Sequence, residues 1–220
     1  VTTMSEKSKV IHEITSTGIV AIIRATNSEQ LIDVVNALRA GGVTCIELTM
    51  TTPNALEVAR QARQMCGSSA FIGVGTVLDA ETARAAILAG AQYIITPIVD
   101  MPTIELCNRY SIPVAPGALT PTEIVRAHQA GADFIKVFPT STLGPTYLKD
   151  LRGPLPHIKL IPTGGVTLDT AADFIQAGAT ALGIGSSLIS KQALANRDFE
   201  TIRKNAAEFL KRVREARAAG

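Results

Sequence analysis

The chain has 220 residues, of which 46% are apolar and 18% are charged, and its formal net charge is +2. This length allows a large core, and the near-neutral charge excludes the basic surface typical of proteins that bind nucleic acid or membranes. No apolar run is long enough to span a bilayer, and the first residues lack the apolar core of a signal peptide. The three cysteines are widely spaced, which is typical of reduced thiols in a cytosolic protein. We therefore expect a cytoplasmic protein with no nucleic-acid partner and no membrane contact.

Apolar runs rich in β-branched residues alternate along the chain with segments of helical periodicity, a pattern that predicts parallel strands joined by helices. The predicted helices cover residues 4–16, 28–40, 53–65, 79–89, 101–110, 121–130, 144–151 and 167–177, and a long one covers 198–217 after a short segment. The predicted strands cover residues 19–24, 43–49, 70–75, 92–96, 112–115, 133–138, 158–162 and 180–185.

A degenerate repeat supports this alternation. Ala40-Gly41, Ala89-Gly90, Ala130-Gly131 and Ala177-Gly178 each end a helical stretch and precede the second, fourth, sixth and eighth strands. Glycine is the natural residue at a helix C-terminus that turns into a strand. We find no linker or low-complexity segment, so residues 1–220 are predicted to form one domain. The expected fold is α/β, a (β/α)₈ TIM barrel with an N-terminal and a C-terminal helix, and a doubly wound open sheet is the alternative.

Lys136 lies in the middle of an apolar and aromatic run, Phe134-Ile135-Lys136-Val137-Phe138-Pro139. Side chains alternate along a strand, so Lys136 should share a face with two phenylalanines and point into the interior. Lysine is rarely buried without a partner or a function. A desolvated neutral amine attacks carbonyl groups, so this residue is a candidate for Schiff-base formation.

Glu47 shares one face of the second strand with Cys45 and Thr49, by the same alternation. If that face points inward, Glu47 meets the same apolar interior as Lys136. Two opposite charges inside one barrel are costly unless they are paired or functional. A structural Lys–Glu ion pair is one interpretation. In the functional interpretation Glu47 moves protons while Lys136 forms an imine with a ketone.

The ends of the strands, where a barrel places its active site, carry further polar residues. Arg24 ends the first strand, and Thr76 and Thr163 end the third and seventh, where packing alone would also explain the threonines. Glycines 164 and 165, with Gly185-Ser186-Ser187 after the eighth strand, form two loops whose backbone N–H groups can approach a phosphate. Tight turns are the alternative explanation for these glycines.

Other site types find no support in the sequence. His12, His128 and His157 lie away from the predicted strand C-termini, and no carboxylate array or HExxH motif indicates a metal. No GxGxxG motif follows the first strand, so dinucleotide binding is not indicated. We therefore expect neither a metal site nor a dinucleotide site.

A set of short motifs runs along the chain and spans most of residues 18 to 190. The motifs are Ala40-Gly41-Gly42-Val43, Ile46-Glu47-Leu48-Thr49, Gly73-Val74-Gly75-Thr76-Val77, Thr96-Pro97, Pro116-Gly117, Phe134 to Pro139, and Pro162-Thr163-Gly164-Gly165-Val166. These motifs resemble those of the class I 2-keto-3-deoxy-6-phosphogluconate (KDPG) aldolase / 4-hydroxy-2-oxoglutarate (KHG) aldolase family. They run in that family's order, and the ordered set is far more specific than any one motif.

The resemblance implies a lyase that cleaves a 2-keto-3-deoxy-6-phospho sugar acid into pyruvate and glyceraldehyde 3-phosphate, acts as a homotrimer and needs no metal or organic cofactor. It implies that Lys136 forms the imine with pyruvate and that Glu47 is the acid/base. The other predicted site residues divide into two groups. Arg24, Thr49, Thr51, Thr76, Pro97, Phe138 and Thr163 are expected to contact substrate, and Gly164, Gly165, Gly185, Ser186 and Ser187 to lie toward its phosphate.

Two positions depart from the family pattern. Phosphogluconate-type members carry arginine two residues after the threonine that matches Thr49, and here that position is Thr51. Arg24 resembles the arginine of the phosphogalactonate-type branch and can supply the missing cation. Ile98 replaces a glycine often found after the Ser/Thr-Pro pair and narrows that wall.

Alternative functions stay open on the sequence. The same imine chemistry would serve a 4-hydroxy-2-oxoglutarate aldolase or a 2-keto-3-deoxy-6-phosphogalactonate (KDPGal) aldolase. A phosphosugar isomerase or epimerase would use the phosphate loops without an imine, and a non-catalytic phosphosugar-binding barrel would need neither charge.

Overall fold

The computed structural model of the chain describes residues 4–24 and 30–219. Within them strands and helices alternate as predicted, and the beginning of the predicted helix 28–40 lies outside the described residues. The strands are β1 (Ile19–Ile23), β2 (Cys45–Thr49), β3 (Phe71–Gly75), β4 (Tyr93–Ile95), β5 (Val114–Ala115), β6 (Gly117–Ala118), β7 (Ile135–Val137), β8 (Leu160–Pro162) and β9 (Leu182–Ile184). The helices are α1 (Glu6–Thr17), α2 (Leu31–Ala40), α3 (Ala55–Cys66), α4 (Ala80–Leu88), α5 (Met101–Arg109), α6 (Pro121–Gln129), α7 (Gly144–Arg152), α8 (Ala171–Gln176), α9 (Lys191–Ala195) and α10 (Phe199–Ala218).

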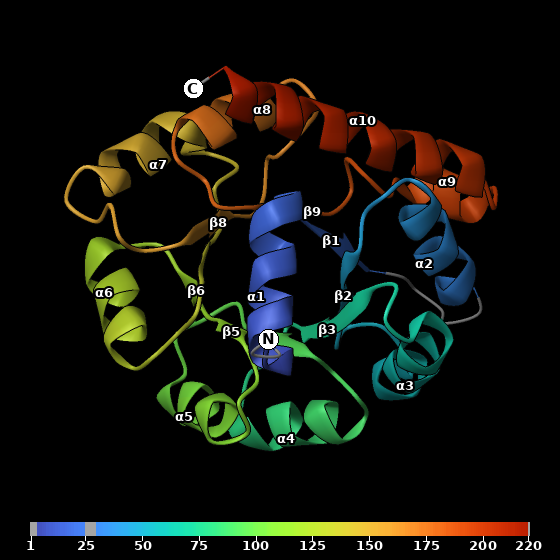
Figure 1. The fold of residues 1–220 in the computed structure, drawn as a ribbon, viewed down its shortest axis with the longest axis horizontal. Coiled ribbons are helices and arrows are strands. Elements are labelled where there is room, and N and C mark those ends of the chain that lie inside the picture. The colour runs from blue at the N-terminus through green and yellow to red at the C-terminus, as the bar shows by residue number, and fades with distance from the viewer. Residues whose placement is uncertain (1–3, 25–29, 220) are drawn as a thin grey trace.

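The strands form two parallel sheets that curve around a common interior, with the helices in a ring outside them (Figure 1). One sheet has the order β5-β4-β3-β2-β1-β9, and the other has the order β6-β7-β8. A single parallel bridge between Thr163 and Gly183 connects the end of β8 to β9. The predicted α/β fold with a parallel sheet is confirmed.

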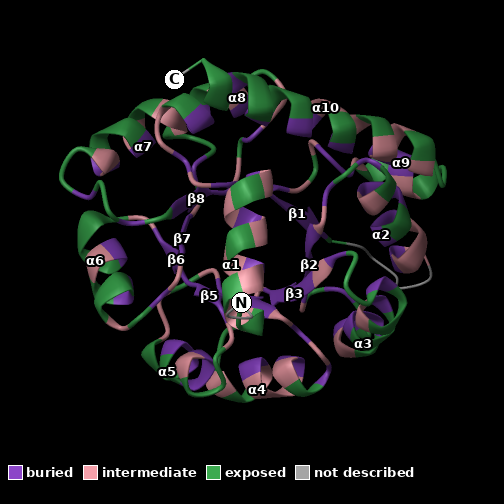
Figure 2. Ribbon diagram, viewed as in Figure 1, coloured by how far each residue is buried: buried purple, intermediate pink, exposed green. Residues whose placement is uncertain are grey.

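Apolar side chains fill both faces of the strands, which explains why the strands read as continuous apolar runs. The outer core lies between strands and helices, and the helices turn their buried faces inward (Figure 2). The inner core is smaller and takes one or two residues from successive strands. Its buried members are Val10, Ile14, Val20, Cys45, Tyr93, Ile95, Ala115, Phe134, Ile161 and Ala181.

Helix α1 closes one end of this interior. Val10 and Ile14 are buried in the inner core, and α1 crosses the centre of the ring of strands in Figure 1. Ser5 caps the helix, since its hydroxyl accepts a hydrogen bond from the Ser8 N–H. Because α1 packs on the side where the strands begin, the opposite side, where the strands end, is left for a site.

The structure corrects three details of the predicted elements. The fifth strand is divided at Pro116, which has no N–H to donate to a ladder; β5 therefore pairs with β4, and β6 pairs with β7. The short segment after the eighth strand contains the helix α9. In three of the four Ala-Gly pairs alanine is the C-cap and the following glycine has positive φ, whereas at Gly41 it is the next residue, Gly42, that does so.

Two further observations concern the described residues. Cys45, Cys66 and Cys107 are buried and free. None of the helices in residues 4–24 and 30–219 is both long and apolar enough to cross a bilayer.

Candidate functional site

Lys136 lies at the centre of the short strand β7. Its backbone pairs with Gly117 of β6 on one side and Ile161 of β8 on the other, and its side chain is 6% exposed. Its neighbour at 134 belongs to the inner core, which confirms the predicted inward face. The Lys136 Nζ lies 5.0 Å from the centre of the Phe138 ring, an aromatic face that attracts a cation.

Glu47 lies on the same interior, on β2, and is 1% exposed. Neither carboxylate oxygen has a hydrogen-bond partner among the described residues. Burial raises the pKa of this carboxyl above its ordinary value near 4.5, and the positive charges of Lys136 and Arg24 oppose that rise only in part. The hydrogen-bonded structural Lys–Glu ion pair is therefore not what the structure shows.

A glycine on β3 makes room for this carboxylate. A Cβ placed on Gly75 would lie 1.7 Å from Glu47 Oε1, far inside van der Waals contact. Gly73, two residues earlier on the same face, leaves space for the ring of Tyr93 in the same way. The glycines of the Gly-Val-Gly-Thr motif thus shape the interior around Glu47.

The residue that ends this motif has a strained backbone. Thr76 has φ of +59°, a conformation that threonine rarely adopts. Such strain costs of order 1–3 kcal/mol and persists where surrounding structure enforces it, often at functional sites.

Thr49 and Thr51 lie at the end of β2. Thr49 is fully buried; its hydroxyl donates to the Ile23 carbonyl at 3.3 Å and lies 3.0 Å from the Thr51 hydroxyl. Thr49 thus joins β2 to β1 and holds the exposed Thr51. Neither threonine lines the cavities described next, and their contact with substrate stays a prediction.

A cavity of about 240 Å³ opens at the ends of β1, β7, β8 and β9. It brings together the cation of Arg24, the ring of Phe138 and both predicted phosphate loops. The predicted residues that line it are Arg24, Phe138, Thr163, Gly164, Gly165, Gly185, Ser186 and Ser187. Phe138 also lines a neighbouring cavity of about 470 Å³, whose wall includes Pro97 and Ile98. Phe138 therefore lies between the two cavities and beside the Lys136 amine.

The Thr163-Gly164-Gly165 loop is held from the chain that follows β7. The Thr140 hydroxyl donates to the carbonyls of Gly164, at 2.6 Å, and Thr163, at 3.1 Å. Gly164 and Gly165 both have positive φ, so a side chain at either position would be strained. Gly183 leaves room for the Thr163 hydroxyl, since a Cβ there would lie 2.2 Å from it.

The sequence analysis missed two residues of this region. Thr140, which is 1% exposed, carried no signal of its own beyond its place after the Phe-Pro pair. Lys191 lines the cavity from the first turn of α9. Ser190, an N-cap residue before the helix-forming run Lys-Gln-Ala-Leu-Ala, was the signal that would have indicated this helix.

The sequence matches the family described as "KDPG and KHG aldolase" over residues 10–205. It is 34% identical over 203 residues to the 2-dehydro-3-deoxy-6-phosphogalactonate aldolase of Escherichia coli K12, covering 92% of this chain and 97% of that one. It is 31% identical over 185 residues to the 2-dehydro-3-deoxy-phosphogluconate aldolase of Treponema pallidum, covering 84% and 88% of the two chains.

Solved structures agree with these relatives. A structure described as native KDPGal superimposes with a TM-score of 0.85 at 33% identity, covering 91% of this chain and 96% of that chain. The KDPG aldolase of Legionella pneumophila, captured with pyruvate as a covalent carbinolamine, shares the fold with a TM-score of 0.84 at 23% identity, covering 93% and 97%. The chain belongs to the KDPG/KHG aldolase family and is an aldolase, as its motifs predicted.

Proposed function

We propose that this aldolase cleaves a 2-keto-3-deoxy-6-phospho sugar acid to pyruvate and glyceraldehyde 3-phosphate through a Schiff base on Lys136. The observation that carries the proposal is the buried Lys136 amine beside the ring of Phe138, a residue that lines the cavity formed with the two glycine loops. The relatives named as phosphogluconate and phosphogalactonate aldolases support the substrate class.

In the proposed reaction the neutral Lys136 amine attacks the C2 carbonyl, and the resulting carbinolamine loses water to give a protonated imine. Loss of the C4 hydroxyl proton then breaks the C3–C4 bond. The bonding electrons pass to the imine as an enamine, and the aldehyde leaves. Protonation of C3 and addition of water to the imine release pyruvate and restore the lysine.

Glu47 is proposed to carry the protons of these steps, directly or through water. Its carboxylate has no hydrogen-bond partner among the described residues, and its pKa is raised by burial. An acid/base works best when its pKa lies near the working pH, so a raised carboxyl pKa suits proton exchange near neutrality. Thr76, Pro97 and Thr163 are proposed to hold the pyruvate half, with the two glycine loops toward the phosphate.

A second candidate substrate is the C4 epimer, the phosphogalactonate acid. Arg24, which resembles the arginine of that branch, lines the cavity, and Thr51 stands where phosphogluconate-type members have arginine. Thr51→Arg is expected to change the ranking of kcat/KM between the two epimers. An unchanged ranking would show that position 51 does not set specificity here.

The remaining expectations extend this proposal. We infer that the two sheets are parts of one (β/α)₈ barrel, which the chain continuity through Pro116 and the Thr163–Gly183 bridge support. A homotrimer, no metal or organic cofactor, and a cytoplasmic location complete the proposal. Light scattering on the purified protein tests the homotrimer. Activity after treatment with a chelator tests whether a metal is needed.

Trapping with pyruvate and borohydride tests the chemistry. Reduction of the imine should add a pyruvate-derived group to Lys136, visible by intact mass and peptide mapping. A folded protein that gives no adduct, next to a known Schiff-base aldolase that does, would overturn the proposed mechanism.

A further inference from the structure

The charged residues that line the cavity at the ends of β1, β7, β8 and β9 are all cations. Its lining includes two cations, Arg24 and Lys191, and no aspartate or glutamate from the described residues. The neighbouring cavity contains one residue of each sign, Glu123 and Arg126. A cavity with two cations and no acid fits a ligand that carries negative charge.

The backbone around Lys191 is held in place by buried side chains and hydrogen bonds. Leu188 and Ile189 are buried, and both of their backbone N–H groups donate to the Gly185 carbonyl at 3.0 Å. The Ser190 hydroxyl then accepts from the Ala193 N–H at 3.0 Å and starts α9. These contacts fix the backbone of Lys191, four residues after Ser187 of the loop Gly185-Ser186-Ser187, where its side chain lines the cavity.

Within the described part of the chain, Lys191 makes neither an ion pair nor a hydrogen bond. By contrast, Lys7 and Lys9 each pair with a carboxylate. An exposed lysine needs no partner, but one that lines an acid-free cavity beside two glycine loops is placed to bind an anion.

The loops alone leave the charge of a phosphate uncompensated. Backbone N–H groups and the hydroxyls of Ser186 and Ser187 are neutral donors, whereas a phosphate monoester carries about −1.5 to −2 charges at pH 7. Hydrogen bonds between ionised partners are roughly twice as strong as neutral ones. The substrate proposed above has an anion at each end, and the cavity has two cations.

We propose that Lys191 supplies the positive charge that binds the substrate phosphate, and so makes this enzyme select phosphorylated over unphosphorylated keto acids. The inference rests on the proposed function and assigns to it a residue that its motifs do not include. Arg24, at the end of β1, is left for the other anionic end of the substrate.

The test compares wild type, Lys191→Met, Lys191→Arg and Gln192→Met on a 6-phosphorylated 2-keto-3-deoxy acid and on its unphosphorylated analogue. The ratio of the two kcat/KM values should fall about 10- to 100-fold in Lys191→Met, the range expected for a hydrogen bond between charged groups. Lys191→Arg should keep most of that ratio. Gln192→Met, the exposed neighbour on the same turn, should keep the wild-type ratio and controls for disturbance of α9.

An unchanged ratio in Lys191→Met would overturn the assignment, as would a loss of selectivity in Arg24→Met alone. Pyruvate trapping on the wild type separates this failure from failure of the proposed function. If Lys136 is not labelled, the aldol mechanism fails whatever position 191 does. Titration of inorganic phosphate, followed by ³¹P NMR, tests Lys191 without turnover: Lys191→Met should weaken binding, and equal affinity would contradict the inference.

Discussion

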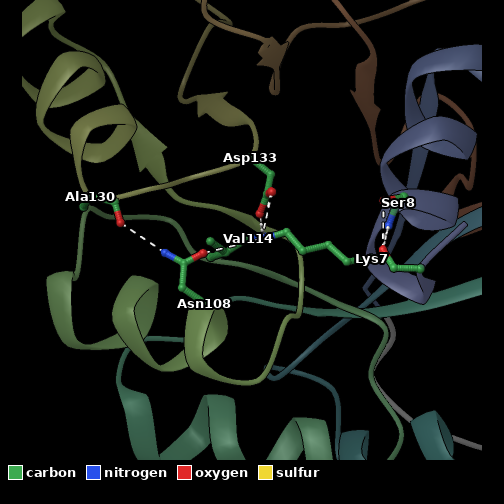
Figure 3. Close-up of polar contacts among 7 residues, drawn as sticks. Lys7, Ser8, Asn108, Val114, Ala130 and Asp133 are labelled. Carbon is green, nitrogen blue, oxygen red and sulfur yellow. Dashed lines mark hydrogen bonds and ion pairs between the residues drawn. The ribbon is translucent and has the colours of Figure 1, made fainter.

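Two pairs of lysine and carboxylate residues, Lys7 with Asp133 and Lys136 with Glu47, differ in how their charges are satisfied. At the end closed by α1, Lys7 Nζ lies 2.9 Å from Asp133 Oδ1 and also donates to the Asn108 side chain at 3.4 Å (Figure 3). The second oxygen of Asp133 accepts the Val114 N–H at 3.0 Å. In the middle of β2, Glu47 has no such hydrogen-bond partner among the described residues, although Lys136 shares its interior.

Lys7 and Asp133 are paired and hydrogen-bonded, as expected of a structural contact, whereas Glu47 is left without a hydrogen-bond partner. The side chains of Lys7 and Asp133 keep 24% and 11% of their exposure, and their hydrogen bonds fasten α1 to the strands. Glu47 is 1% exposed, and an unpartnered buried carboxyl costs stability. A buried carboxyl without a hydrogen-bond partner supports the proton-transfer function proposed for Glu47.

The substitution with the largest expected effect on turnover is Lys136→Ala. We expect pyruvate release to fall by at least about a thousandfold, because no other described amine occupies the interior beside Phe138. The fold should persist, since Lys136 is not a hydrogen-bond partner of Glu47. Steady-state kinetics with circular dichroism measures both.

Lys7→Ala is the matched control, because it removes a lysine from the other couple and should keep turnover within about twofold of wild type. Near-normal turnover in a folded Lys136→Ala protein would mean that the two couples do not differ in function.

Gly75→Ala should have the next largest effect. The added methyl would meet Glu47 Oε1 at 1.7 Å, so the carboxylate must move. A displacement of about 1 Å in a catalytic group can cost about a hundredfold in rate, and we expect kcat to fall by that order. Gly153→Ala, whose Cβ meets nothing closer than 3.4 Å, should leave kcat unchanged.

If Gly75→Ala lost its melting transition, the result would be uninformative about Glu47, so the melting temperature is measured alongside. Wild-type kcat in the folded variant would contradict the importance of the Glu47 position.

The residues of the interior were predictable because strand periodicity fixes them. The alternation along residues 134–138 placed Lys136 on the inward face, and that along residues 45–49 placed Glu47 on the same face as Cys45. The structure shows that both faces point inward. The unpartnered state of Glu47 was not predictable. It depends on the side-chain space left by Gly75, which lies on another strand, and alternation within one strand carries no such information.

Local breaks in the elements were harder to predict than the elements themselves. Pro116 interrupts a ladder of backbone hydrogen bonds because β4 and β7 pair with the chain on either side of it. Which strands lie beside it depends on the tertiary fold and not on the local sequence. Helix α9 has five residues, too few for a hydrophobic period to be recognised. Lys191 was missed for that reason, whereas Gly183 and Gly185, which precede it, stand out by composition alone.

The pH dependence of stability gives a finer test of Glu47. Its pKa in the folded protein is raised above the unfolded value near 4.5, so the folded state binds more protons between the two values, and stability falls as pH rises through that window. The amide in Glu47→Gln cannot ionise, so the stability of this variant does not fall in that window. The free energy of unfolding of Glu47→Gln relative to wild type should therefore increase from pH 4.5 to pH 7.5.

Urea denaturation at the two pH values measures this difference. Glu123→Gln is the control of opposite sign, since hydrogen bonds from Thr120 and Leu119 lower the pKa of that carboxyl. A Glu47→Gln difference that stayed constant between the two pH values would show that burial does not shift the Glu47 titration.

The smallest expected effect concerns the structural couple. Lys7→Met keeps the length of the side chain and removes its charge, leaving Asp133 Oδ1 without its ion pair while Oδ2 still accepts the Val114 N–H. Because both groups are partly exposed, we expect a loss of about 0.5–1.5 kcal/mol, or roughly 1–5 °C in melting temperature.

Lys9→Met is the matched control two residues along α1. Lys9 pairs with Glu6 at 2.6 Å, but both side chains are well exposed, so solvent and salt screen the interaction. We expect no measurable change in melting temperature for Lys9→Met and a clear decrease for Lys7→Met, with turnover unaltered in both. Equal effects of the two substitutions would mean that the Lys7–Asp133 contact adds nothing beyond an ordinary surface pair, and α1 would then be held by Val10 and Ile14 alone.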